Sequence, residues 1–162
     1  MELPFQLIFS LILIAIFLYA AFTGIKYVLE RGDQARIGEF LVDLKSKVNS
    51  AWQATEIENT YSFEIPKRIK LVCFGDLKKK INNTVCPDFD IYREQAVSQG
   101  SNLFFCPPKG AYSVGSPVHF KIDCNGNDCL EFKQPLYCVS NEGKISIRLE
   151  KSLGSKKVSL SV

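Results

Sequence analysis

Residues 3–25, LPFQLIFSLILIAIFLYAAFTGI, contain no charged side chain and dominate the organisation of the chain. As a helix, this apolar segment would be about 35 Å long at 1.5 Å per residue. That length is sufficient to cross a bilayer core of about 30 Å. Pro4 lies where a helix would begin, a position that tolerates proline. The segment therefore predicts a membrane-anchoring helix.

A cleaved secretory signal peptide is the competing interpretation of the apolar segment. Signal peptides have a basic start, a shorter apolar core and a cleavage site made of small residues. Here no Lys or Arg precedes the apolar segment, and the small pair Ala20-Ala21 is followed by further apolar sequence. Tyr19, Phe22 and Tyr27 lie toward its far end, as interfacial aromatic residues do. We therefore expect an uncleaved anchor.

Two features of the sequence disagree about membrane orientation. Lys26, Arg31 and Arg36 follow the apolar segment, which by the positive-inside rule places the rest of the chain in the cytoplasm. The cysteines favour the opposite side, because disulfides persist outside the cytosol. An Asn-Asn-Thr sequon makes Asn82 a glycosylation candidate, which also favours the outside. We expect an extracytoplasmic C-terminal domain.

Residues 34–57 keep a helical period but become amphipathic. Steps of four and three connect Ile37, Leu41, Leu44, Val48 and Ala51 into one apolar stripe. This stripe packs either on the C-terminal domain of the same chain or, in part, on neighbouring copies. The candidate assembly and packing residues of the whole helical region, 1–57, are Phe5, Leu11, Ala20, Ala21, Gly24, Ile37, Phe40, Leu41, Leu44, Val48 and Trp52.

The remaining residues, 58–162, have the period of two that is typical of half-buried strands. Apolar residues recur at every second position over residues 61–65, 69–73, 118–122, 145–149 and 158–162, which places Val72 and His119 opposite the buried face. The run Leu103–Cys106 is wholly apolar and predicts a central strand. Asn141-Glu142-Gly143 predicts a hairpin between the strands on either side of it. The chain is thus expected to be α+β, with a long N-terminal helix and an antiparallel sheet or sandwich.

All six cysteines lie in this C-terminal domain, which predicts up to three disulfides of open connectivity rather than buried thiols. The candidates are Cys73, Cys86, Cys106, Cys124, Cys129 and Cys138. Cys124 and Cys129 flank a turn sequence and pair either with each other or with neighbouring strands.

Asp123, Asn125 and Asn127 resemble the start of a calcium loop. However, Asp128 stands where such a loop needs glycine, and Gln134 stands where it needs glutamate. We therefore expect no metal site.

Composition and motifs argue against catalysis and against nucleic-acid binding. The 20 basic and 17 acidic residues give a net charge of +3, too balanced for a nucleic-acid surface. The single histidine, His119, is expected to be structural or at the surface, and Asp88 and Asp90 are expected in a solvated loop. There is no phosphate loop, zinc-type Cys/His pairing or nucleophile elbow. We expect no catalytic residue and no cofactor.

An apolar helix that continues into an amphipathic helix, followed by a disulfide-containing β domain, resembles the architecture of type IV pilins, including archaeal ones. In pilins the apolar half anchors the subunit in the membrane before assembly and forms the filament core afterwards. The resemblance implies a non-enzymatic cell-surface filament subunit whose partners are the lipid bilayer and further copies of itself. The chain shows no prepilin cleavage motif, and Phe5 stands where many bacterial pilins have glutamate.

Two other functions fit the same pattern. One is a monomeric single-pass membrane protein that presents an extracytoplasmic β-rich binding domain. The other is an accessory subunit of a membrane complex.

Overall fold

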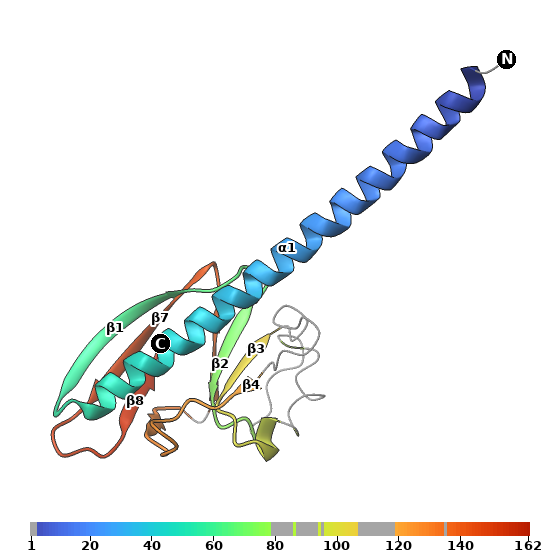
Figure 1. Cartoon of the computed structure of the whole chain (residues 1–162). Coiled ribbons are helices and arrows are strands. Elements are labelled where there is room, and N and C mark those ends of the chain that lie inside the picture. The colour runs from blue at the N-terminus through green and yellow to red at the C-terminus, as the bar shows by residue number, and fades with distance from the viewer. Residues whose placement is uncertain (1–2, 79–85, 87–93, 95, 107–118, 135) are drawn as a thin grey trace. The chain divides into compact units, whose positions relative to one another are not determined.

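The computed structural model describes residues 3–78, 86, 94, 96–106, 119–134 and 136–162. The chain divides into two compact units, Met1–Gln34 and Ala35–Val162. The second unit is called the head below. A single helix, α1 (Leu3–Gln53), begins in the first unit and ends in the head (Figure 1). The division lies within α1 rather than at its end because residues 35–53 belong to the core of the head.

The first unit consists of helix alone, and none of its side chains from residue 6 to residue 29 is covered by the chain. The exposed fractions of its large apolar side chains run from 40% for Leu13 to 74% for Tyr19. By length and composition, α1 is capable of crossing a membrane. Thr23 Oγ1 donates to the carbonyls of Tyr19 and Ala20, each at 3.0 Å, which satisfies its polar group within the helix.

The head contains two sheets of four strands. The first sheet has the order β1 (Ile57–Glu64), β7 (Lys144–Lys151), β8 (Val158–Ser161) and β5 (Leu130–Phe132). Its strands pair antiparallel except β5 and β8, which are parallel. The second sheet is antiparallel, with the order β4 (His119–Phe120), β3 (Leu103–Cys106), β2 (Leu71–Gly75) and β6 (Leu136–Ser140). The expected α+β class with antiparallel-rich sheets is confirmed.

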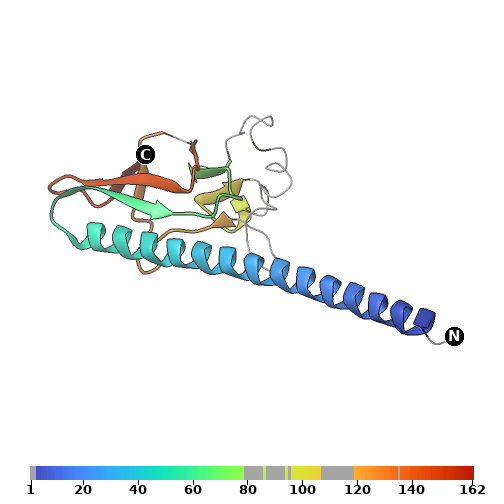
Figure 2. The same cartoon turned by 90° about the horizontal axis from the view of Figure 1, so that it is seen from above.

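The end of α1 lies beside β1 and β7 in both views and fills the core of the head (Figure 1, Figure 2). Its predicted stripe is buried, with Leu44, Val48 and Ala51 wholly inaccessible to solvent. The Phe40 ring contacts Phe63 of β1 at 5.4 Å and Phe105 of β3 at 5.9 Å between centroids. One side chain of α1 therefore joins both sheets.

Polar contacts fix the last turn of α1 to the first sheet. Trp52 Nε1 donates to the Lys156 carbonyl at 3.2 Å. Lys151 Nζ donates to the carbonyls of Trp52 and Ala54, the latter at 2.7 Å. An ammonium group at this position satisfies carbonyls that have no partner within the helix and complements the negative end of the helix dipole.

The predicted hairpin at residues 141–143 is wrong, because β6 and β7 belong to different sheets. The turn is instead a corner between the sheets, held by the buried side chain of Asn141. Its Nδ2 donates to the carbonyls of Pro66 at 3.0 Å and Ile69 at 2.9 Å, and its Oδ1 accepts from the Gly143 N–H at 2.8 Å. Gly143 has a φ of 108°, a backbone conformation that residues with a Cβ rarely adopt.

Two alternations predicted in the second sheet are also wrong. Val72 was expected on an outer face but is fully buried, like Cys73 and Phe74. Successive side chains of a strand point to opposite faces, so both faces of β2 are covered. His119 was expected opposite the buried face, yet it is only 5% exposed. The predicted alternation of Ile145, Ile147 and Leu149 and the buried central strand Leu103–Cys106 are confirmed.

Candidate functional site

The apolar part of α1 is the first candidate site, because its exposed surface lacks a partner within the described chain. Leu11 is 58% exposed, and Ala20, Ala21 and Gly24 are exposed as well. A Cβ added at Gly24 would meet nothing within 4 Å. Glycine inside a helix costs roughly 0.5–1 kcal/mol relative to alanine, so contacts within the described chain do not explain its presence here. The side chain of Phe5 lies outside the described residues.

The amphipathic part of α1, in contrast, buries its apolar stripe in the head. Ile37, Phe40, Leu44 and Val48 are at most 7% exposed, and Leu41 and Trp52 are partly buried against the same core. The stripe thus packs on the head of its own chain, which was the first of the two interpretations. Val42 of this part of α1 is a large apolar side chain that remains solvent-exposed, at 72%.

The three disulfides predicted by the cysteine count are formed, and no cysteine is free. Cys73 and Cys138 bridge directly opposite positions of β2 and β6. Cys86 is joined to Cys106 at the end of β3. Cys124 and Cys129 pair with each other, the first of the two expected possibilities.

The loop closed by Cys124 and Cys129 has no feature of a metal site. Asp123 instead accepts from Lys45 of α1, with Oδ1 and Nζ 2.9 Å apart. The hydrogen bond from Lys45 is the main reason that the pKa of Asp123 lies below its usual value of 3.8. Among the described residues there is no group of three His, Cys, Asp or Glu side chains that could hold a metal. Asn82, Asp88 and Asp90 lie outside the described residues.

His119 is buried in β4, where its Nδ1 lies 3.0 Å from the Ser101 hydroxyl oxygen. Burial lowers the pKa of His119 below its ordinary value of 6.5, which favours the neutral ring. A neutral imidazole nitrogen can accept the hydroxyl hydrogen of Ser101. Because the ring is covered by the head, this contact satisfies a buried polar group and holds the start of β3 beside β4.

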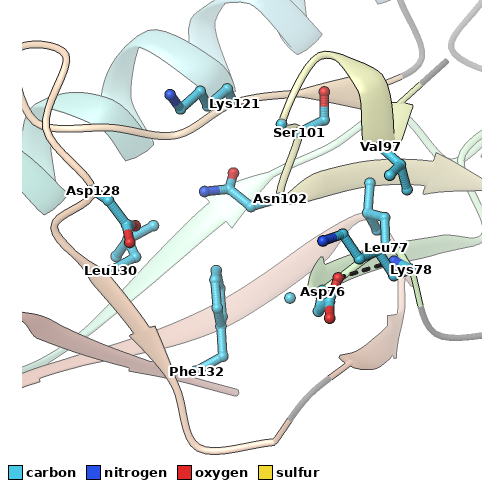
Figure 3. A pocket seen from close by; sticks show the side chains of 12 residues that line it. Asp76, Leu77, Lys78, Val97, Ser101, Asn102, Lys121, Asp128, Leu130 and Phe132 are labelled. Carbon is cyan, nitrogen blue, oxygen red and sulfur yellow. Dashed lines mark hydrogen bonds between the residues drawn. The ribbon is translucent and has the colours of Figure 1, made fainter. Parts of the chain in front are cut away.

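The head also contains an open cavity of about 420 Å³. Figure 3 shows side chains that converge on it from four segments, at the ends of β2 and β4, before β3 and around β5 (Figure 3). Its lining residues are Gly75, Asp76, Leu77, Lys78, Val97, Gly100, Ser101, Asn102, Lys121, Asp128, Leu130 and Phe132.

Several polar groups of the cavity are already fixed by the fold. Asn102 donates to the Ile122 carbonyl at 2.8 Å and accepts from the Ile122 N–H at 2.7 Å. Asp76 Oδ1 accepts from the Lys78 N–H at 3.0 Å. Asp128 pairs with Lys157 at 2.9 Å, and this contact raises the pKa of Lys157. The cavity therefore has a preformed polar frame.

Comparison of the chain with protein-family models, curated proteins and solved structures found no match.

Sequence reasoning identified the helix surface and the cysteines but missed the cavity. Gly75-Asp76 was recognised only as a turn, and Asp128 only as part of the loop between two cysteines. Lys78, Lys121 and Phe132 have no shared motif, since they come from segments that only the fold brings together. No local signal in the sequence could have found this site.

Proposed function

We propose that this protein is a cell-surface, pilin-like filament subunit that assembles through the apolar part of α1. The observation that carries the proposal is that every side chain over residues 6–29 is exposed in the isolated chain. Monomeric soluble proteins rarely expose contiguous apolar patches larger than a few hundred Å². This surface therefore needs a covering partner. The partner is lipid before assembly and further copies of the chain in the filament.

Close contact between helices supports assembly over simple anchoring. In lipid, helices associate through van der Waals packing, and small residues let their backbones approach. Ala20, Ala21 and Gly24 supply small side chains on this part of α1, and the space around Gly24 is empty. These residues are the proposed points of contact between copies.

The construction of the head supports a role outside the cytosol. Its disulfides are compatible with an oxidising compartment, where such bonds persist. The end of α1 is held in the head by Leu44, Val48 and the Lys151 contacts. A subunit of this kind would present a crosslinked domain on the outside of an assembly formed by its apolar helix.

The test is negative-stain electron microscopy of surface material from cells that produce the full chain, combined with crosslinking. A photoreactive residue in place of Leu11 is expected to link copies into a ladder, and thin filaments should contain the chain. Gly24→Leu should reduce both, because the larger side chain separates the helices. Ile16→Leu changes an exposed apolar side chain with little change in volume and serves as the control.

Monomer alone after mild detergent extraction, with crosslinks to lipid only, would overturn the filament proposal. That outcome would favour a second candidate, a monomeric single-pass membrane protein that presents a binding domain. The cavity of the head is the observation in favour of this candidate.

A further inference from the structure

We infer that the cavity of the head is a binding site for an acidic saccharide. This inference goes beyond the proposed filament function and does not depend on it, because all the residues concerned belong to the head. The cavity volume of about 420 Å³ falls within the range of about 300–1,000 Å³ that is usual for small-ligand sites. Lys78, two aspartates and an aromatic ring decide the class of ligand.

Lys78 favours a negatively charged group on the ligand. Among the residues that the structure describes, Lys78 has no carboxylate within ion-pair distance, whereas Lys45 and Lys157 have one at 2.9 Å. Lys121 directs its ammonium away from the middle of the cavity, and its charge acts on Asp123 (Figure 3). The Lys78 ammonium points toward the middle of the cavity, as Figure 3 shows (Figure 3). A carboxylate or sulfate on the ligand would form charge-assisted hydrogen bonds with it.

The aspartates require hydrogen-bond donors on the same ligand. Asp76 and Asp128 are exposed carboxylates of the lining. Asp76 accepts from the Lys78 N–H and Asp128 pairs with Lys157, and each carboxylate has further acceptor positions beyond that contact. A ligand with only negative groups would be repelled by them. A ligand that carries hydroxyl groups beside an acidic group would satisfy both the aspartates and Lys78.

The apolar part of the lining favours a ring over an extended chain. Phe132 is half-buried and directs its ring toward the cavity, next to the buried side chain of Leu130 (Figure 3). An aromatic face of this kind packs on the flat C–H face of a sugar ring, and burial of that face adds hydrophobic stabilisation. Together these groups match a sugar acid better than a simple anion or an amino acid.

The test is isothermal titration calorimetry on the full chain in neutral detergent, with tri-galacturonate as the probe. We expect saturable binding, and we expect its methyl ester to bind at least about tenfold more weakly, because esterification removes the charge that Lys78 contacts. Lys78→Gln should likewise weaken binding of tri-galacturonate about tenfold. Lys78 is exposed, so the variant should keep the unfolding temperature of the parent chain.

The matched control is Lys144→Gln. Lys144 is also an exposed lysine of the head, but it lines no part of the cavity and pairs with Glu64 at 3.4 Å. Its loss should leave the affinity unchanged. Phe132→Leu should weaken binding of tri-galacturonate and leave any weak binding of citrate as it was, since citrate has no ring face.

Three results would overturn the inference. One is the absence of binding by tri-galacturonate. Another is equal affinity for citrate or free leucine, which would assign the cavity to simple anions or to amino acids. The third is an equal loss of affinity for tri-galacturonate in Lys78→Gln and Lys144→Gln, which would show that the ligand responds to the net charge of the surface and not to the cavity.

Discussion

The two parts of α1 show how one helix can meet two different environments. Over residues 6–29 every side chain is exposed, and almost all of them are apolar. Over residues 35–53 one stripe is buried in the head, and the remaining faces are largely polar. The difference follows from what covers each part. The head covers one stripe of the second part, whereas no described residue of the chain covers the first.

This comparison separates folding from assembly. The second part of α1 belongs to the core of the head and should behave as part of its folding unit. The first part should contribute little to the stability of the head, because every side chain over residues 6–29 is exposed. Four changes test this division between folding and assembly.

Truncation should give the largest effect. A chain that begins at Ala35 should fold, with an unfolding free energy within about 1 kcal/mol of the full chain. A chain that begins at Ile57 should be unfolded, because it lacks Phe40, Leu44 and Val48. Buried side chains of this size contribute about 1.5–3 kcal/mol each, a large share of the total of about 5–15 kcal/mol. Near-UV circular dichroism and urea unfolding measure the fold and the stability of the two truncated chains. A folded chain that begins at Ile57 would show that residues 35–53 are not needed for the core of the head.

Removing a disulfide should weaken the head more when the loop that it closes is longer, because the entropy of loop closure grows with the logarithm of loop length. Cys73 and Cys138 are 65 residues apart, whereas Cys124 and Cys129 are 5 apart. In the chain-entropy model the first bridge contributes about 4 kcal/mol and the second about 2 kcal/mol. Urea unfolding of the two double alanine variants measures the difference. Equal losses would show that loop entropy does not dominate, and the helix content of residues 6–29 should be unchanged in both.

A matched pair of leucines compares the two parts of α1 directly. Leu44 is fully buried and Leu11 is 58% exposed. Leu44→Ala should lower the unfolding free energy of the head by about 3 kcal/mol, because it leaves a cavity in the core. Leu11→Ala should change it by less than about 0.5 kcal/mol. Denaturation in neutral detergent measures both, and similar losses would mean that the first part of α1 also supports the head.

The ion pair between Lys45 and Asp123 should give the smallest effect, because Lys45 is half exposed. Lys45→Gln should lower stability by about 0.5 kcal/mol at neutral pH. Since the pKa of Asp123 is lowered in the folded head, its contribution is complete above the usual value of 3.8. That contribution is lost as the pH falls through the lower folded pKa. The difference in unfolding free energy between the parent chain and Lys45→Gln, measured by urea unfolding, should therefore vanish in strong acid. A difference that increases in strong acid would show that it does not come from this ion pair.

Much of the fold was predictable from local sequence patterns. The apolar segment, the stripe through Leu44 and Val48, and the alternation in β7 each depend on neighbours within about two helical turns or one strand. The run Leu103–Cys106 was recognisable as a central strand because it has no polar face. Val72 was misassigned because Lys70, two residues before it, suggested a solvent-facing side of the strand, although both faces of β2 are buried.

The long helix, the change from apolar to amphipathic along it, and a disulfide-containing β domain were all predictable from the sequence. The reason is that periodicity and cysteine content are properties of short stretches and of composition. Three features required the folded chain: the pairing of Cys73 with Cys138, the corner that Asn141 forms between the sheets, and the packing of the predicted stripe on its own head. The cavity with Lys78 and Phe132 belongs to this second group. These features depend on contacts between segments far apart in the chain, whose geometry is set only when both sheets pack together on α1.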